Sequence, residues 1–217
     1  MEIAVLLYNG LTALDAVGPV EILGALPNAE IRFVAEERGT IKTDGALSLI
    51  ADFAFDEVSA PEIILVPGGF GTFPAMNNSY ILEWLRAAHQ TSTFTTSVCT
   101  GSLILAAAGL LVGDRATGHW NYLEQLRMFG VTPASERIVE AGKIITAAGV
   151  SAGIDMALRL VQIIAGDDAA IAAGLAAEYD PAPPVVTGSP EKVSPAIVAA
   201  VSRAMNGRAA EWARNKS

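Results

Sequence analysis

The stretch TFTTSVCTGSLILAAA, residues 93–108, decides the fold and points to the chemistry of this chain. Its first six residues have the β-branched and aromatic character of a buried strand, and its last seven have the apolar pattern of a helix. Between them lie Cys99, which is the single cysteine, and the small pair Thr100 and Gly101. We therefore predict a sharp strand-to-helix turn with a thiol at its apex.

Such a turn favours a reactive thiol. The free N–H groups and the dipole of the following helix stabilise a thiolate, so the pattern predicts that Cys99 has a lowered pKa and acts as a nucleophile. The alternative is an inert side chain, because free cysteines are usually buried and pack as small hydrophobes. The position at a strand end favours the nucleophile, since active sites gather at that edge of open α/β sheets.

The composition predicts one compact domain over residues 1–217, with a large apolar core. Hydrophobic residues make up 52% of the chain, which suggests that some apolar surface is covered in a homodimer.

The net charge of -9 argues against nucleic acid as a partner. Glu2 in the first apolar run argues against a signal peptide, and the apolar residues 103–112 are too few to cross a membrane. A single cysteine excludes an internal disulfide and fits a cytoplasmic location.

The order of the predicted elements indicates an α/β fold with a mostly parallel sheet, because strands and helices alternate along the chain. Strands are predicted at residues 3–8, 31–36, 63–66 and 93–98, and helices at 16–25, 80–85, 102–108, 122–128, 154–164, 168–178 and 195–213. The dipeptide Asp44-Gly45 predicts a hairpin at the sheet edge, and residues 137–146 predict a second hairpin. Prolines make residues 181–190 irregular.

Three predicted strand ends carry candidate site residues, and parallel strands bring their carboxyl ends to one crevice. Asp15 follows the first strand, where it is either a helix N-cap, which position alone favours, or a general acid/base for the thiol. Gly68 and Gly69 follow a later strand, where they form a plain turn or donate N–H groups to an anion. Thr100 follows Cys99 and either caps the helix or donates into the same pocket.

Further candidates for substrate binding lie later in the chain. His119 and Trp120 either line the pocket or pack on each other, and Gly149 and Val150 follow the second hairpin. Neither His119 nor His89, the only histidines, has a cysteine or carboxylate at metal-ligand spacing, so no metal is expected. No nucleotide-binding glycine motif is present, so no cofactor is expected.

Four motifs together resemble the ThiJ/PfpI superfamily of glutamine-amidotransferase-like proteins over nearly the whole chain. They are LDAVGP at residues 14–19, LVPGG at 65–69, SVCTG at 97–101 and ATGHW at 116–120. The resemblance implies a flavodoxin-like sandwich with helices on both faces, usually a homodimer. It also implies that Cys99 is the nucleophile and Asp15 the acid/base.

Residues 178–190 are similar to the corresponding segment of isonitrile hydratases, also called isocyanide hydratases. That branch implies a cofactor-independent lyase that hydrates an isonitrile, a small-molecule substrate, to an N-substituted formamide. Cys99 would attack the isonitrile carbon, Asp15 would supply a proton, and water would resolve the thioimidate. Thr100 and the amides of Gly68 and Gly69 would stabilise the reacting groups.

The chain departs from the protease-like and glyoxalase-like branches. Those branches typically carry a glutamate where Asp15 stands, and many protease-like members have a histidine where Thr100 stands.

Two alternatives to an enzyme remain open. A very similar cysteine turn occurs in the sensor half of AraC-type regulators, although residues 195–217 are one helix long and a helix-turn-helix needs more. A peroxide-responsive thiol protein would rely on the same low thiol pKa.

Overall fold

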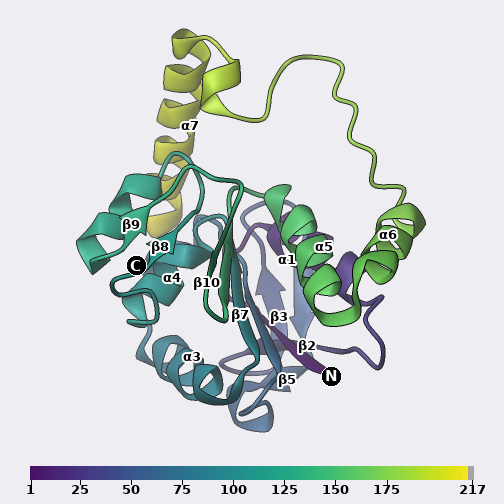
Figure 1. The fold of residues 1–217 in the computed structure, drawn as a ribbon. Helices are drawn as coiled ribbons and strands as arrows, with labels where there is room; N and C mark the ends of the chain where they lie inside the picture. The colour runs from purple at the N-terminus through teal and green to yellow at the C-terminus, as the bar shows by residue number, and fades with distance from the viewer. Residues whose placement is uncertain (215–217) are drawn as a thin grey trace.

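The computed structural model describes residues 1–214, so residues 215–217 of the predicted domain lie outside the described part. A seven-stranded sheet forms its centre, in the order β10-β11-β7-β6-β1-β2-β5 (Figure 1). All neighbouring strands are parallel except β10 and β11. The strands are β1 (Glu2–Leu6), β2 (Glu30–Ala35), β5 (Phe53–Ala54), β6 (Ile63–Val66), β7 (Phe94–Val98), β10 (Ile138–Ala141) and β11 (Ile144–Ala147).

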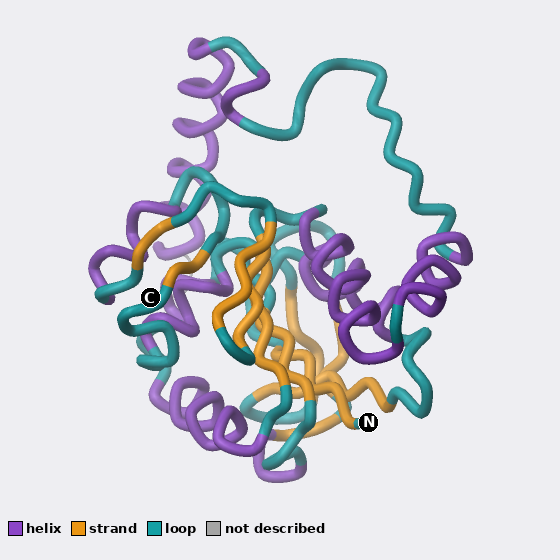
Figure 2. Tube along the Cα trace, viewed as in Figure 1, coloured by secondary structure: helices purple, strands orange, loops and turns teal. Residues whose placement is uncertain are grey.

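Helices cover both faces of this sheet, as Figure 2 shows with the strands in orange between two groups of purple helices. One group contains α1 (Ala13–Leu23), α5 (Ala152–Ala165) and α6 (Asp167–Ala176), in which α5 packs on the other two. The second group contains α2 (Thr72–Ala75), α3 (Ser79–Thr91), α4 (Gly101–Ala107) and the 3-10 helix η2 (Leu123–Phe129), with α4 against the rest. The predicted α/β sandwich with a mostly parallel sheet is confirmed.

The central strands are apolar on both sides because helices cover both sides. Every residue of β6 is buried, and so is every residue of β1 except Glu2. Helix α3 shows the contrasting pattern of a surface helix, with Ile81, Trp84, Leu85 and Ala88 forming its buried stripe.

Three details differ from the predictions. The hairpin around Asp44 consists of β3 (Gly39–Lys42) and β4 (Ser48–Ala51), but these form a separate two-stranded sheet rather than an edge of the main one. The helix predicted at residues 122–128 is the 3-10 helix η2, which ends at Gly130 with φ 73°. Two short strands, β8 (Arg115–Ala116) and β9 (Thr132–Pro133), pair with each other and were not predicted.

The C-terminal part of the chain leaves the sandwich after α6. Residues 177–194 run as a long, mostly exposed segment, with one 3-10 turn, η3 (Pro190–Lys192), before α7 (Pro195–Arg214) (Figures 1 and 2). No residue of α7 is buried. The helix therefore lies on the surface, where only one of its sides contacts the rest of the chain. Within residues 1–214, no helix combines the length and the apolarity that crossing a membrane requires.

Candidate active site

The site forms where the carboxyl ends of four adjacent strands meet. Strands β11, β7, β6 and β1 are neighbours in the sheet. The segments that follow them carry Val150, Cys99, Gly68 and Asp15, respectively. Parallel packing thus brings together residues from four distant parts of the sequence, as the strand-end argument predicts.

Cys99 lies at the predicted turn between β7 and α4. Its φ is 60°, a left-handed conformation that is uncommon for a residue with a side chain. The turn is fixed by its backbone N–H, which donates to the carbonyl oxygens of Ala147 (3.1 Å) and Ala148 (2.9 Å) after β11. The side chain of Cys99 is 5% exposed. The predicted turn is therefore confirmed, with the sulfur just within reach of the surface.

The predicted lowering of the Cys99 pKa is wrong for the unliganded protein. Burial raises the pKa of the thiol well above its usual range, and the nearby charge of Asp15 raises it further. The N–H groups of Thr100 and Val150 hydrogen-bond to the sulfur and oppose this, but they do not offset it. The same burial removes the basis of the peroxide-responsive alternative, which needs a thiol of low pKa.

Asp15 lies in the first turn of α1 and is fully buried. It is not the N-cap that its position favoured, because the helix begins two residues earlier, at Ala13, and Thr12 is the cap residue. Its Oδ2 accepts a hydrogen bond from the N–H of Gly68 at 2.9 Å, while Oδ1 has no partner among residues 1–214. Burial raises the pKa of Asp15 to about 7, against hydrogen bonds from Gly68 and from the Cys99 thiol that lower it.

Asp15 and Cys99 therefore act as one titrating pair. Two negative charges side by side in a buried site repel, so the pair keeps one proton at neutral pH and slightly above. Either the thiol or the carboxyl can carry that proton. When the proton moves to Asp15, the sulfur becomes a thiolate and the carboxyl becomes an acid beside it.

The N–H groups of Gly68 and Gly69 are already engaged, which corrects the prediction that they stabilise an anion. That of Gly68 holds Asp15, and that of Gly69 donates to Thr100 Oγ1 at 2.9 Å. Gly68 must lack a side chain, since a Cβ there would lie 2.4 Å from the backbone nitrogen of Thr100. These glycines position the acid and Thr100 rather than binding a ligand directly.

Thr100 does not cap α4 with its side chain. Its hydroxyl instead accepts from Gly69 and shares a 2.8 Å hydrogen bond with the hydroxyl of Thr72. Its backbone N–H and its hydroxyl both hydrogen-bond to the sulfur of Cys99. Thr100 therefore orients the thiol from the start of α4.

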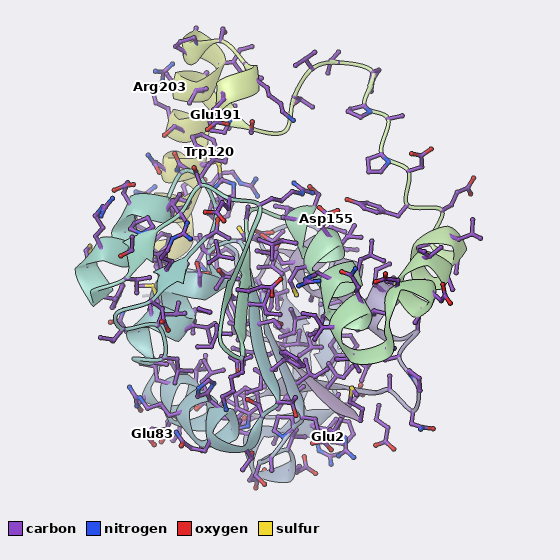
Figure 3. All side chains as sticks on the ribbon, viewed as in Figure 1. Glu2, Glu83, Trp120, Asp155, Glu191 and Arg203 are labelled. Carbon is purple, nitrogen blue, oxygen red and sulfur yellow. The ribbon has the colours of Figure 1, made fainter. Side chains whose placement is uncertain are left out.

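A small cavity of about 50 Å³ opens onto the sulfur. Five of the predicted site residues line this cavity, namely Gly69, Cys99, Thr100, His119 and Val150. The other four predicted residues, Asp15, Gly68, Trp120 and Gly149, are not part of the lining. Asp15 lies outside this lining but hydrogen-bonds to the Cys99 thiol, which is part of it. Figure 3 draws Trp120 at the end of the sandwich from which α7 projects.

His119 is a neutral wall of this cavity. Its Nδ1 accepts a hydrogen bond from the N–H of Asn121 at 3.2 Å, and burial lowers its pKa to about 4. Gly149 packs on the ring, because a Cβ at this position would lie 2.8 Å from Cδ2 of His119. Within residues 1–214, no three His, Cys, Asp or Glu side chains form a group that could hold a metal ion.

Sequence reasoning missed five residues that complete the lining, namely Thr12, Asp44, Phe70, Tyr122 and Met205. Asp44 accepts a 2.6 Å hydrogen bond from the Thr12 hydroxyl, and it was interpreted only as a turn residue. Tyr122 is 7% exposed; the Asn121 side chain hydrogen-bonds to its oxygen, but its hydroxyl proton has no acceptor in the described part of the chain. A buried phenol in this state is a donor free to bind a ligand.

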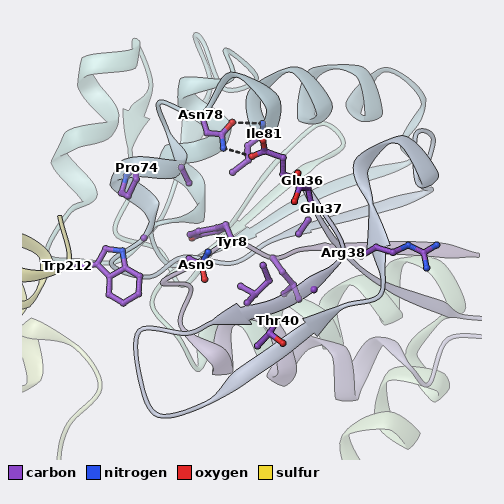
Figure 4. A pocket seen from close by; sticks show the side chains of 16 residues that line it. Tyr8, Asn9, Glu36, Glu37, Arg38, Thr40, Pro74, Asn78, Ile81 and Trp212 are labelled. Carbon is purple, nitrogen blue, oxygen red and sulfur yellow. Dashed lines mark hydrogen bonds between the residues drawn. The ribbon is translucent and has the colours of Figure 1, made fainter. Parts of the chain in front are cut away.

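A larger cavity, about 610 Å³, lies elsewhere and does not contain the thiol. Figure 4 shows it between Trp212 at one end and Arg38 at the other, with Tyr8 and Asn9 in its floor. Asn78 and Glu36 on its wall hydrogen-bond to each other at 2.9 Å. The smaller cavity is the candidate site, because it is the one that the Cys99 thiol lines.

The raised pKa of Asp15 predicts a measurable effect on stability. Between pH 5 and pH 8 the folded carboxyl loses its proton, whereas in the unfolded chain it is mostly ionised throughout, so raising the pH destabilises the fold. The Asp15→Asn variant lacks this pH-dependent contribution to stability. Its side-chain oxygen can still accept the hydrogen bond from the N–H of Gly68. We expect the free energy of unfolding of Asp15→Asn, relative to the unmodified protein, to rise by about 2 kcal/mol between these pH values. Urea unfolding at both pH values measures it, and a constant difference would contradict the buried, ionisable carboxyl.

A cysteine at a strained strand-to-helix turn, backed by a buried carboxyl at the edge of a parallel sheet, defines a class of α/β proteins built for thiol chemistry. The model of the DJ-1/PfpI family matches residues 1–163. This chain therefore belongs to the DJ-1/PfpI family, as the resemblance of its motifs predicts.

Individual relatives agree with this assignment. The chain is 38% identical over 198 residues to an isonitrile hydratase from Pseudomonas putida, covering 91% of this chain and 87% of that protein. It superimposes on a crystal structure of a ThiJ/PfpI family protein from Pseudomonas syringae with a TM-score of 0.91 and 35% identity, over 96% of this chain and 88% of that one. It is also 28% identical to the transcriptional regulator CdhR from Pseudomonas aeruginosa, of which it spans 41%, matching 64% of its own length.

Proposed function

We propose that this protein hydrates an isonitrile to an N-substituted formamide, with Cys99 as nucleophile and Asp15 as acid and base, and without a cofactor. The observation that carries the proposal is the buried carboxyl of Asp15, which hydrogen-bonds to the thiol and has a pKa of about 7. The similarity to the isonitrile hydratase of Pseudomonas putida supports the choice of substrate. A single shared proton suits this reaction, because the isonitrile carbon must accept both a nucleophile and a proton.

In the first step, the thiol proton moves to Asp15 and the sulfur of Cys99 attacks the terminal carbon of the isonitrile. The new C–S bond places an electron pair on that carbon, and Asp15 protonates it. The product is a thioimidate, R–N=CH–S–Cys99, and a carboxylate at Asp15. The hydrogen bond between Gly68 N–H and Asp15 Oδ2 leaves Oδ1 to carry the proton.

In the second step, water adds to the thioimidate carbon. The Asp15 carboxylate, now unprotonated, takes one proton of the water, and the Tyr122 hydroxyl gives its proton to the nitrogen, which forms the tetrahedral intermediate R–NH–CH(OH)–S–Cys99. When this intermediate collapses, its hydroxyl proton returns to Tyr122, the C–S bond breaks with the electron pair on sulfur, and the formamide R–NH–CHO is released. The proton on Asp15 then returns the site to its starting state.

Tyr122 supplies the donor for the nitrogen. Its buried hydroxyl lines the cavity and, among the described residues, donates its proton to no protein acceptor, so it can donate to a bound substrate. Thr100 and Val150 orient the sulfur on the other side through their N–H groups. The three residues together place donors around both ends of the reacting group.

Tyr122→Phe tests this assignment with almost no change in shape. We expect kcat to fall about 10-fold to 100-fold with little change in KM, because the lost hydrogen bond strengthens as the nitrogen becomes basic. Tyr80→Phe is the matched control, since that phenol is 63% exposed and outside the cavity. Equal kcat values for Tyr122→Phe and the control would exclude a role for the phenol.

We further propose a homodimer of single domains that works in the cytoplasm. Exposed apolar side chains on and after α6 support the dimer, with Ile171, Leu175, Val185 and Val186 each at least 66% exposed. A reducing compartment suits a reaction whose nucleophile is the single thiol.

The direct test of the function is to incubate the protein with ethyl isocyanide and follow N-ethylformamide by NMR. We expect formamide in proportion to protein concentration. If neither this isonitrile nor smaller and larger ones gave formamide above the rate without protein, the proposed function would be wrong.

A further inference from the structure

Helix α7 lies over the cavity of Cys99, although it follows the family-matched residues 1–163 in the chain. Its Met205 is one of the side chains that line the cavity. Met205 comes from a segment more than a hundred residues from Cys99. A helix outside the family-matched residues therefore forms part of the wall of the cavity that contains the thiol.

Polar and aromatic contacts hold α7 in this position. Arg208 lies with its guanidinium carbon 4.7 Å from the ring centroid of Phe70, and it donates to the carbonyl oxygen of Asp44 at 3.0 Å. Phe70 and Asp44 themselves line the cavity, so this anchor is directly at its rim. Near the end of the helix, Trp212 packs against Gly10, where a Cβ would lie 2.4 Å from the indole ring.

A second anchor lies beside Tyr122. The Ser202 hydroxyl donates to Asn121 Oδ1 at 2.5 Å, and Asn121 Nδ2 donates to Asn206 Oδ1 at 3.0 Å. Met205 and Asn206 lie three and four residues after Ser202, so both lie on the same side of the helix as Ser202. Met205 is thus held over the cavity between the Asn121 contacts and Arg208.

The cavity under Met205 is small. Its volume of about 50 Å³ holds about four water molecules, and ligands of drug size occupy about 300–1,000 Å³. It accepts an isonitrile group with a short aliphatic substituent, but a ring on the nitrogen needs more space. Methionine is unbranched and flexible, so its removal enlarges the site without disturbing a packed core.

We propose that Met205 is a specificity-determining residue, which limits the size of the substituent on the isonitrile nitrogen. This inference rests on the proposed function and names the part of the substrate that meets α7. The reacting carbon lies at Cys99, and the substituent extends toward α7. Helix α7 then selects the substrate, while the family-matched part of the chain performs the chemistry.

The test compares Met205→Ala and Met205→Trp with the unmodified protein, using ethyl and cyclohexyl isocyanide. We expect Met205→Ala to raise the ratio of kcat/KM for cyclohexyl over ethyl isocyanide about 10-fold, and Met205→Trp to lower it. Met128→Ala is the matched control, because that methionine is 75% exposed on η2 and is not part of the cavity lining. Met205 is only partly buried and packs on the outside of the core, so these variants leave the buried core residues themselves unchanged.

A second readout needs no hydratase activity. The rate of alkylation of Cys99 by N-cyclohexylmaleimide, divided by its rate with iodoacetamide, reports the space above the sulfur. We expect this ratio also to rise about 10-fold in Met205→Ala. If alkylation changes in this way but no isonitrile is hydrated, the proposed function fails and the size limit set by Met205 stands. If isonitriles are hydrated and neither ratio changes in either variant, the hydratase stands and the role of Met205 is overturned.

Discussion

Cys99→Ala is expected to lower the rate of formamide production at least about 10⁴-fold, to the level of the reaction without protein. The proposed mechanism passes through a bond to sulfur, and no other thiol exists in the chain to replace it. The change should leave the fold intact, because alanine removes one small side chain and adds no bulk. Product formation under saturating ethyl isocyanide, with circular dichroism as a check of folding, measures the effect.

Cys99→Ser sharpens this experiment. The hydroxyl keeps a polar atom in place of the sulfur but is a much weaker acid and nucleophile, so we expect it to be nearly as inactive as alanine. Substantial turnover by either variant would mean that water attacks the isonitrile directly, and the covalent mechanism would have to be abandoned.

Asp15→Asn is expected to lower kcat by about 10²-fold to 10⁴-fold, because it removes the proton donor for carbon and the base for water. Asparagine keeps the shape and can still accept the hydrogen bond from Gly68, so the loss reports proton transfer rather than a collapsed site. The control is Asp56→Asn, an exposed carboxylate on the surface, which should have normal activity.

The pH dependence separates a proton-transfer role from a structural one. The active state has one proton on the Asp15–Cys99 pair; below about pH 7 both groups are protonated and no base is available to the thiol. We expect kcat/KM of the unmodified protein to rise with pH through about 7, and this rise to be absent in Asp15→Asn. An unchanged profile in the variant would show that Asp15 does not control the proton.

Much of the fold could be predicted because local sequence and tertiary structure agree. The apolar residues 63–66 form β6 with the predicted bounds, and the run ending at Val98 forms β7 before the turn at Cys99. Predictions failed where several conformations satisfy the same pattern. The hairpin around Asp44 has good turn chemistry, but the sequence does not say which strand it pairs with, and it forms its own sheet.

The site was predictable only where residues directly follow strands. Cys99 and Asp15 were found in this way, and their neighbourhood follows from the order of the strands. The depth of burial was not predictable from a local pattern, and it reversed the expected shift of the thiol pKa. The role of Met205 could not be predicted for a different reason. It lines the site from a helix that is joined to the sandwich by the long segment 177–194, and the sequence does not show where that helix packs.

The central claim is that an isonitrile becomes bonded to Cys99 before water releases it. Intact-protein mass spectrometry after rapid acid quench, on Asp15→Asn as well as the unmodified protein, tests it most directly. The account predicts a species heavier by the mass of one isonitrile molecule in the unmodified protein, mapped to Cys99 by peptide analysis and absent from Cys99→Ala. Steady formamide production with no such adduct at any quench time, or an equal adduct in Cys99→Ala, would contradict it.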